Sequence, residues 1–404
     1  MAWLLFIGSA VEAGSPARAE SAEETSAGQS HLDRLVETYF RSDDPEARER
    51  IANSIEDAAN GSIKAVVRSV HRANLWTALP QEEGQFEFSV SPGDTFSIGY
   101  RLPAGYDPAQ RYPAVLCLPG EGAEAAQTRL LATGVLGEAA RDFVRICPAR
   151  PVGGAFHQPL GAAADFRQLM RQVRQRIHID TDRFFLFGLG RGGDAAWMTA
   201  LAHADLFAGV IVLSAYPPLP YPEQVYPFLL RNLRGVGVLS VWGGGDHPLA
   251  TARQKAIAAH NRGIVKFAKK VGLDVVGVEV PYESLVDLTP PAGEVAKMLR
   301  RRRRPKMDEV SHWFRYPGQG HAGWLEQVKH GAEVWEADQL AILPAPGTDR
   351  DTCIADIVKE KLAYLGGRIE GQTITIESRK CRRVEVCLST EALDWSRPVI
   401  VQCN

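Results

Sequence analysis

The chain has 404 residues, of which 45% are hydrophobic and 23% are charged, a composition typical of a soluble globular protein. Its length predicts about two or three domains of roughly 150 residues each. The 46 Lys and Arg residues nearly balance the 48 Asp and Glu residues, so the net charge is −2 and no global field attracts a polyanion. We therefore expect no nucleic-acid binding. No apolar run approaches the roughly 18 residues that a membrane span needs.

The first residues have the pattern of a signal peptide. The apolar stretch Ala2 to Val11 is followed by Ala17-Arg18-Ala19, a small-residue pattern typical of a cleavage site. We expect residues 1–30 to be a leader and the mature protein to be extracytoplasmic, either periplasmic or secreted. A buried N-terminal helix or strand is the alternative. Export would permit disulfides among the 6 cysteines, but their spacing does not assign the pairs.

Residues 31–84 are predicted to form a helical arm. Apolar residues recur at helical spacing from Leu32 to Phe40, and Asp44-Pro45 provides a capping residue with proline at the first position of the next helix. Asn60-Gly61 ends that helix. The arm is too small for a core of its own, so we expect it to pack on the rest of the chain.

Between residues 85 and 305 the pattern alternates between strands and helices. Half-buried strands are predicted at 86–90 and 96–100, and buried strands at 114–118, 143–147, 184–187, 210–213, 236–241 and 275–280. Helices are expected at 160–177, 192–203, 221–232, 251–271 and 294–304. The alternation predicts an α/β domain with a mostly parallel sheet and helices on both faces.

Beyond Pro305 the pattern predicts a small, mainly antiparallel β domain over residues 306–404. We expect a hairpin formed by 310–316 and 322–328, and further strands at 373–376, 384–388 and 399–401. A helix at 354–365 is the only expected interruption. The arginines at 300–304, just before this domain, complement the dipole at the end of a helix.

The most specific motif is the segment from Phe184 to Ala196, FFLFGLGRGGDAA. A buried strand runs into Gly188-Leu189-Gly190-Arg191-Gly192, and a helix begins at once. This is the pattern of the nucleophile elbow, G-x-S-x-G, whose central residue projects from a strained turn between strand and helix. Here the central residue is Gly190. A dinucleotide-binding loop is less consistent, because the motif lies deep in the domain and no acidic ribose partner occurs at the right interval after it.

Residues 85–305 resemble the α/β-hydrolase superfamily, in particular its secreted esterases and its prolyl-oligopeptidase-like and dienelactone-hydrolase-like enzymes. The matching segments are RLPAGY at 101–106, YPAV at 112–115, LPGEG at 118–122, GGDAAW at 192–197, LFAGV at 206–210 and VWGGGD at 241–246. The resemblance implies the α/β-hydrolase fold. It also implies that the oxyanion and cleft positions are Gly120, Glu121, Gly122 and Arg191.

The catalytic triad that this resemblance implies is incomplete. Gly190 holds the nucleophile position, so no acyl-enzyme can form there. Asp246 matches the acid position, but the stretch from Pro281 to Pro291, where the histidine is expected, contains none. The sequence therefore predicts a catalytically degenerate protein that binds or scaffolds a small molecule, a peptide or a glycan in its cleft.

Two alternatives remain open. The first is an active ester or peptide hydrolase with a relocated site that uses Asp246 and His321, because Gly318-Gln319-Gly320-His321 looks like a G-x-G-H motif. The second is a structural module that works through its C-terminal β domain. The chain has no metal-ligand spacing and no cofactor motif, so we expect neither a metal nor a cofactor.

Overall fold

The computed structural model describes residues 22–404 except 43, 74–75, 77–78, 80, 92–93, 121–124, 150–161, 220–221, 282–289, 304–307, 317, 331–346, 348 and 389–391. The predicted apolar stretch and cleavage pattern lie in residues 1–21, outside the described residues. Among the described helices, none is both long enough and apolar enough to cross a membrane.

Three helices form the predicted N-terminal arm: α1 (Ala22–Arg41), α2 (Pro45–Ala59) and α3 (Ile63–Arg72). The Asp44 side chain caps α2 by accepting from the Glu46 N–H, and Asn60 ends that helix in the left-handed conformation. The three helices pack around a small cluster of their own that contains Leu32 and Val36. Helix α1 begins inside the segment predicted as leader.

The arm contacts the rest of the molecule through polar bonds to α5 (Ala162–Arg176). The Gln175 side chain donates to the Phe40 carbonyl at 2.8 Å, and the Trp76 indole donates to the Arg174 carbonyl at 2.7 Å. The Trp76 ring also stacks on His178 with ring centroids 3.4 Å apart. These contacts join the arm to the rest of the chain, but the arm also has an apolar cluster of its own, which the sequence did not predict.

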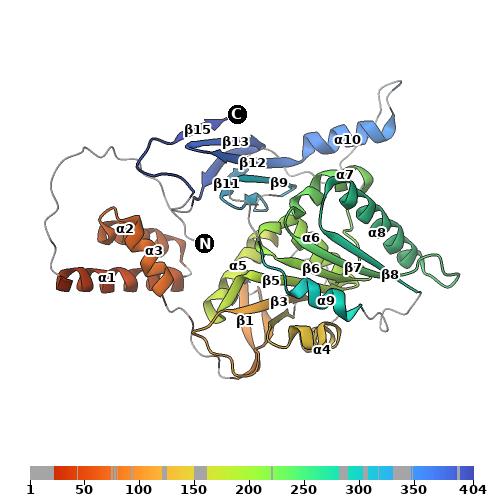
Figure 1. Cartoon of the computed structure of the whole chain (residues 1–404), viewed down its shortest axis with the longest axis horizontal. Helices are drawn as coiled ribbons and strands as arrows, with labels where there is room; N and C mark the ends of the chain where they lie inside the picture. The colour runs from red at the N-terminus through yellow and green to blue at the C-terminus, as the bar shows by residue number, and fades with distance from the viewer. Residues whose placement is uncertain are drawn as a thin grey trace.

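The central sheet has eight strands in the order β1-β2-β4-β3-β5-β6-β7-β8 (Figure 1). Strand β2 pairs antiparallel with both β1 and β4, and the remaining strands are parallel. The strands are β1 (Glu83–Ser91), β2 (Asp94–Arg101), β3 (Tyr112–Leu118), β4 (Val144–Pro148), β5 (Ile179–Leu189), β6 (Gly209–Leu213), β7 (Gly237–Gly243) and β8 (Val275–Val280). The predicted mostly parallel sheet is confirmed.

Helices cover both faces of this sheet (Figure 1). Helices α4 (Ala125–Leu136) and α9 (Ala292–Leu299) pack on one face. Helices α5, α6 (Arg191–Ala202), α7 (Pro222–Leu229) and α8 (Ala252–Val271) pack on the other. Short 3₁₀ turns come directly after three of these helices: η1 (Gly137–Ala140), η2 (Ala204–Leu206) and η3 (Leu230–Leu233).

The sequence did not predict α4, and the structure shows why. Its buried residues, among them Ala132 and Leu136, lie on one face, but Leu130 on another face is 76% exposed, so the apolar residues in the sequence do not mark the buried face. The central strands, in contrast, behave as expected. Ala114 and Leu116 of β3 enter the core on one face of the sheet, and Val115 enters the core on the other.

The C-terminal segment forms two small sheets, one with the order β10-β11-β14 and one with the order β15-β13-β12-β9. All of its strand pairs are antiparallel except β13 with β15. Its elements are β9 (Glu309–Phe314), β10 (His321–Ala322), β11 (Leu325–His330), α10 (Arg350–Lys361), β12 (Ala363–Glu370), β13 (Thr373–Arg379), β14 (Cys381–Val386) and β15 (Ile400–Cys403). The smaller, mainly antiparallel β-rich part is thus confirmed.

Two details of the C-terminal prediction are wrong. Residues 310–316 and 322–328 do not form one hairpin, because β9 pairs with β12 whereas β11 pairs with β10 and β14. The short β10–β11 hairpin turns instead at Gly323, whose φ is 58°. The helix expected at 354–365 ends at Lys361, and β12 begins at Ala363.

The C-terminal segment is tied to the larger sheet by apolar and polar contacts. Helix α10 contributes Ile354 and Val358 to the core on the α5 face of the sheet, and Leu362 joins them directly after the helix. The Asn232 side chain donates to the Trp313 carbonyl at 2.7 Å and accepts from the Trp313 N–H at 2.8 Å. The predicted domain limit at 305/306 falls at residues 304–307, outside the described residues.

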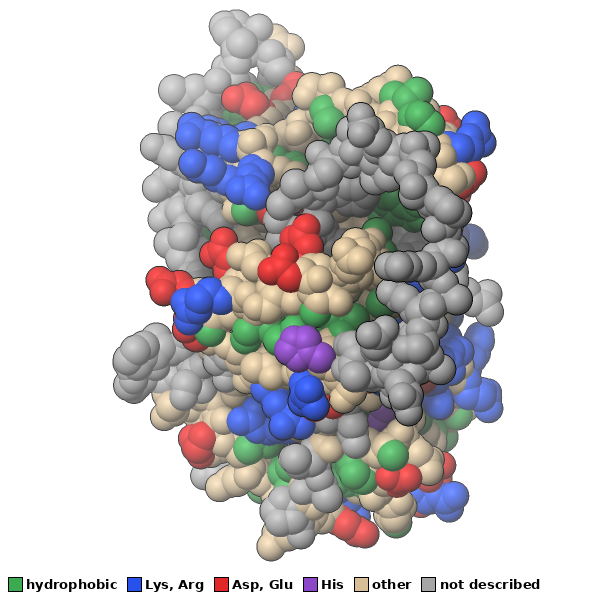
Figure 2. Space-filling model, turned by 90° about the vertical axis from the view of Figure 1, so that its left-hand side faces the viewer, with side chains coloured by type: hydrophobic (Ala, Val, Ile, Leu, Met, Phe, Trp, Pro, Cys, Tyr) green, Lys and Arg blue, Asp and Glu red, His purple; other side chains and the backbone are tan. Residues whose placement is uncertain are grey.

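Some of the arginines near the end of the larger sheet's last helix are paired with acidic side chains. The arginine run that ends α9 is held by carboxylates: Arg301 pairs with Asp274, and Arg302 pairs with Asp180 at 3.2 Å. On the face shown in Figure 2, basic and acidic side chains occur in small neighbouring groups. All six cysteines are free thiols.

Candidate functional site

The elbow motif forms a sharp turn at the carboxyl end of β5. Strand β5 ends at Leu189, and α6 begins at Arg191, so a single residue reverses the chain. That residue, Gly190, has φ 57° and ψ −119°, in the left-handed region that favours glycine. Its N–H donates to the Leu213 carbonyl at 2.9 Å, and its carbonyl accepts from the Asp194 N–H at 3.0 Å.

Glycines around the turn allow the strand, the helix and their neighbours to approach closely. A Cβ at Gly188 would lie closer than 3.0 Å to the Gly192 backbone, and a Cβ at Gly192 would lie equally close to the Leu118 carbonyl. A Cβ at Gly193 would lie 2.5 Å from the Ala215 Cβ. These positions therefore exclude any side chain. A buried strand, a one-residue turn and a helix packed at this distance make up the elbow described for hydrolases.

The strand order, the antiparallel second strand and this elbow together decide the fold. The chain has the α/β-hydrolase fold. The residue that would carry the nucleophile, however, has no side chain. Of the other positions at the elbow, Gly120 lies two residues beyond β3, while Glu121 and Gly122 lie outside the described residues. The Arg191 side chain is 60% exposed, with Nη1 3.7 Å from Asp194 Oδ2.

Asp194 is an ionisable group at the elbow that the sequence reasoning missed. Its side chain is 3% exposed, binds Arg253 Nη2 at 2.8 Å and accepts from the Tyr216 N–H at 3.2 Å. Burial raises the pKa of Asp194, although the bond from Arg253 opposes that effect. An acidic residue in the first turn of an otherwise apolar helix was the available signal.

Asp246, at the acid position, lies on the surface. Its side chain is 82% exposed and binds Arg262 Nη2 at 2.6 Å, and this bond lowers the pKa of Asp246. The Arg262 guanidinium also binds Glu279 of β8, with Nε 2.9 Å from Oε2. Asp246 is therefore held by a cation from α8. Most of the loop where the histidine was expected, residues 282–289, lies outside the described residues.

His321 lies in a different part of the molecule. Its Nδ1 pairs with Oδ2 of Asp205, and its side chain is 10% exposed. Asp205 belongs to η2, just after the end of α6, whereas Gly190 precedes the start of that helix. A helix of 12 residues separates the two places by about 18 Å. The relocated couple of Asp246 with His321 is therefore not formed, because each group has another partner.

Asp205 and His321 each stabilise the charged form of the other. Burial alone would lower the pKa of His321, but the charge and hydrogen bond of Asp205 raise it. Burial alone would raise the pKa of Asp205, but the charge of His321 holds it well below its usual range. Two further buried histidines are neutral, because burial lowers the pKa of His203 to about 3 and that of His312 to about 4. A second salt bridge, between Arg167 of α5 and Glu326 of β11, involves two more charges that act on His321.

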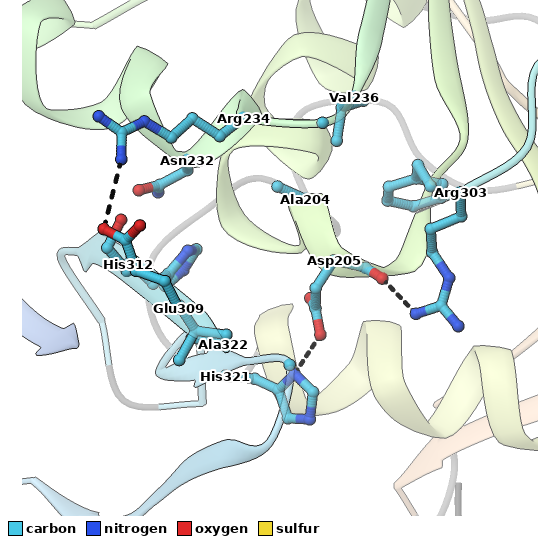
Figure 3. A pocket seen from close by; sticks show the side chains of 15 residues that line it. Ala204, Asp205, Asn232, Arg234, Val236, Arg303, Glu309, His312, His321 and Ala322 are labelled. Carbon is cyan, nitrogen blue, oxygen red and sulfur yellow. Dashed lines mark hydrogen bonds and ion pairs between the residues drawn. The ribbon is translucent and has the colours of Figure 1, made fainter. Parts of the chain in front are cut away.

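This pair borders a pocket of about 340 Å³ (Figure 3). The pocket lies between β9 and β10 on one side and the segments after α6, η3 and α9 on the other. The sequence reasoning singled out only His321 here. The signal for the rest was weak: His203 and Asp205 lie two positions apart between a helix and a buried strand. Among the described residues, no group of His, Cys, Asp and Glu is arranged to hold a metal ion.

No family model and no curated protein matches the chain. Solved structures similar to it include a thermostable esterase, with 16% identity and a TM-score of 0.42 over 55% of this chain and 63% of that chain. Another is the fluorophosphonate-binding serine hydrolase FphF of Staphylococcus aureus, with 13% identity, a TM-score of 0.39 and coverage of 54% and 98%. A third is a ferulic acid esterase of Anaeromyces mucronatus, with 14% identity, a TM-score of 0.38 and coverage of 56% and 93%.

The chain thus spans less than two thirds of the length of the thermostable esterase. The fold assignment rests on the strand order and the elbow of this chain.

Proposed function

We propose that this protein is a catalytically degenerate α/β-hydrolase-fold protein that binds a ligand without hydrolysing it. One observation carries the proposal: the elbow turn has the geometry that presents a nucleophile, yet residue 190 is a glycine. Without an oxygen or sulfur at this position, no covalent intermediate can form at the elbow. We expect the protein's ligand to be a small molecule, a peptide or a glycan that it meets outside the cytoplasm and binds beside the turn.

The lack of a general base supports the same proposal. The sequence has no histidine between His260 and His312, the region downstream of the acid position. Asp246 therefore has no imidazole to orient in this region, and its carboxylate binds Arg262. A site that has lost its triad retains at most the roughly 10³–10⁴-fold acceleration that an oxyanion hole and substrate binding provide.

Hydrolase assays on the purified full-length protein test the proposal. We expect no hydrolysis of p-nitrophenyl acetate above the rate of the heat-denatured protein, and no labelling by a fluorophosphonate probe. The variant Gly263→Ala, which changes an open position in α8, serves as a folded control from the same preparation. Hydrolysis by the wild type that disappears in His321→Ala would overturn the proposal and favour a relocated site.

A further inference from the structure

Two cysteines lie next to each other on neighbouring strands of the central sheet. Strands β3 and β4 run parallel with Leu116 opposite Ile146, and the next residue on each strand is a cysteine, Cys117 on β3 and Cys147 on β4. Both are free thiols in the structure. The function proposed for the elbow makes no use of them, so an inference about this pair goes beyond that function.

The two cysteine side chains point to the same face of the sheet. Both enter the apolar core on the side of α4, together with Val115, whereas Leu116 enters the core on the opposite side. The side chains of Cys117 and Cys147 contact each other through a hydrogen bond. Neighbouring strands lie about 4.8 Å apart, and the two Cα atoms of a disulfide are usually about 4.4–6.8 Å apart. The pair therefore lies where a disulfide can form.

The other four cysteines do not share this arrangement. Cys381 of β14 and Cys403 of β15 each lie opposite a residue other than cysteine. Cys353 lies in α10, and Cys387 directly follows β14. The pair on β3 and β4 is therefore the one that strand register favours.

Burial determines when this pair can react. Cys117 and Cys147 are both 0% exposed, so an oxidant does not reach their sulfur atoms in the folded protein. The hydrogen bond with Cys147 and burial also raise the pKa of Cys117 well above its ordinary value, and a thiol that stays protonated is a poor nucleophile. In the unfolded chain both thiols are accessible and have the ordinary cysteine pKa. A disulfide between them must therefore form before α4 and α9 cover this face of the sheet.

We propose that Cys117 and Cys147 form a disulfide between β3 and β4 when the chain folds in an oxidising compartment. Export, which the first residues of the sequence predict, would supply such a compartment. The thiolate of one cysteine attacks a sulfur of a small disulfide such as oxidised glutathione, whose S–S bond breaks and releases one glutathione thiolate. The second cysteine then attacks the mixed disulfide and releases the other glutathione. The two protein thiols lose two electrons and two protons, and the two glutathione molecules take them up as thiols.

The disulfide stabilises the folded protein. It closes a loop of about 30 residues that contains α4 and η1. A closed loop of this length lowers the entropy of the unfolded chain. We expect the disulfide form to melt about 5–10 °C above the reduced form.

Refolding of the full-length protein under two redox conditions tests the proposal. The reduced, unfolded chain is diluted either into reduced and oxidised glutathione or into dithiothreitol. Free thiols are then blocked with iodoacetamide in denaturant, and linked peptides are identified by mass spectrometry. In the glutathione buffer we expect a linked peptide pair that contains Cys117 and Cys147. The same buffer added to reduced protein that has already folded should produce no such pair, because both sulfur atoms are covered.

Two variants locate the effect on stability. Cys147→Ala removes one partner, so its melting temperature should be the same after refolding in either buffer. Cys403→Ala, at an exposed position of β15, should keep the difference of about 5–10 °C. If Cys147→Ala does not fold, Cys117→Ala replaces it, and the peptide measurement on the wild type needs no variant.

Three results would overturn the proposal. The first is wild-type protein that refolds in the glutathione buffer without a bond between Cys117 and Cys147. The second is a bond from either residue to another cysteine. The third is a bond that forms equally fast in the protein that has already folded, because the pair would then not depend on folding for its oxidation.

Discussion

The two ends of helix α6 contrast sharply in what they offer chemically. At its start, Gly190 has the backbone conformation of a nucleophile turn but provides no reactive atom. At its end, Asp205 and His321 form a buried charged pair beside a pocket, in a place that no short motif marks. The comparison shows that a turn can have the geometry of a nucleophile elbow without a reactive side chain, and that titratable groups can gather at a site with no local signature in the sequence.

The first prediction tests how strictly the elbow geometry is fixed, and it carries the largest expected effect. Gly188→Ala places a Cβ closer than 3.0 Å to the Gly192 backbone, at the junction of β5 and α6. We expect a loss of about 4 kcal/mol or more in the free energy of unfolding, or no folded protein at all. Urea denaturation measures the change.

The control for this variant is Gly134→Ala in α4, where an added Cβ has no atom within 4 Å. We expect this helical substitution to stabilise the protein by about 0.5–1 kcal/mol. Equal stability of the Gly188→Ala variant and the wild type would mean that the elbow tolerates a side chain, and the contrast between the two ends of α6 would weaken.

The second prediction concerns the charged pair at the other end of the helix. Asp205→Ala leaves the imidazolium of His321 buried without its partner, which typically costs about 3–5 kcal/mol. The matched control is Asp246→Ala, which removes an acid from an exposed ion pair and should hardly move the denaturation midpoint. A small effect at both positions would show that His321 finds other stabilisation, for example from Glu326, whose charge also raises its pKa.

The contrast between the two ends of α6 also explains which structural features could be predicted from the sequence. The elbow depends on local features, namely a buried strand, closely spaced glycines and a helix within 13 residues, so the motif predicted both the fold and the position of the turn. The central strands were equally predictable from the sequence, because successive residues are buried on opposite faces of the sheet, Val115 on one and Leu116 on the other. Local patterns therefore sufficed for most of the hydrolase-like sheet.

The pocket beside Asp205 and His321 could not be predicted from local patterns in the sequence. Asp205 and His321 are separated by more than a hundred positions in the sequence, and contacts such as that of Asn232 with Trp313 bring the C-terminal segment to this part of the larger sheet. A strand's partner depends on tertiary packing, and here the expected hairpin was wrong. Without the correct pairing, His321 was matched with Asp246 on the strength of a motif alone.

A third prediction uses pH to separate the buried histidines. The pKa of His321 is raised, so its stabilising contribution is complete below the ordinary histidine pKa of about 6.5 and is lost as the pH rises through its folded value. The pKa values of His203 and His312 are lowered, so their effect is opposite: stability is lost as the pH falls below about 6.5. The wild type should therefore be most stable near that pH.

The variant His321→Gln isolates the two effects. Its stability should still fall towards acidic pH, but the loss above about pH 6.5 that His321 causes in the wild type should be missing from its profile. Urea denaturation at a series of pH values measures both limbs. His247→Gln, at an exposed position, is the matched control and should leave the profile unchanged. A profile of His321→Gln parallel to that of the wild type would mean that His321 is not bound as a cation to Asp205.

The last prediction returns to the elbow and expects the smallest change. Gly190→Ser supplies a hydroxyl at the nucleophile position, with about 1 kcal/mol of strain for a side chain at φ 57°. Hydrolysis of p-nitrophenyl acetate should nevertheless stay at background. The serine has no imidazole to take its proton, because the sequence has no histidine between His260 and His312. Turnover should require a second change that places a histidine within 284–286, oriented by Asp246 after its release from Arg262. Turnover by Gly190→Ser alone would reveal a base already present at the elbow, and the protein would then be one substitution away from catalysis.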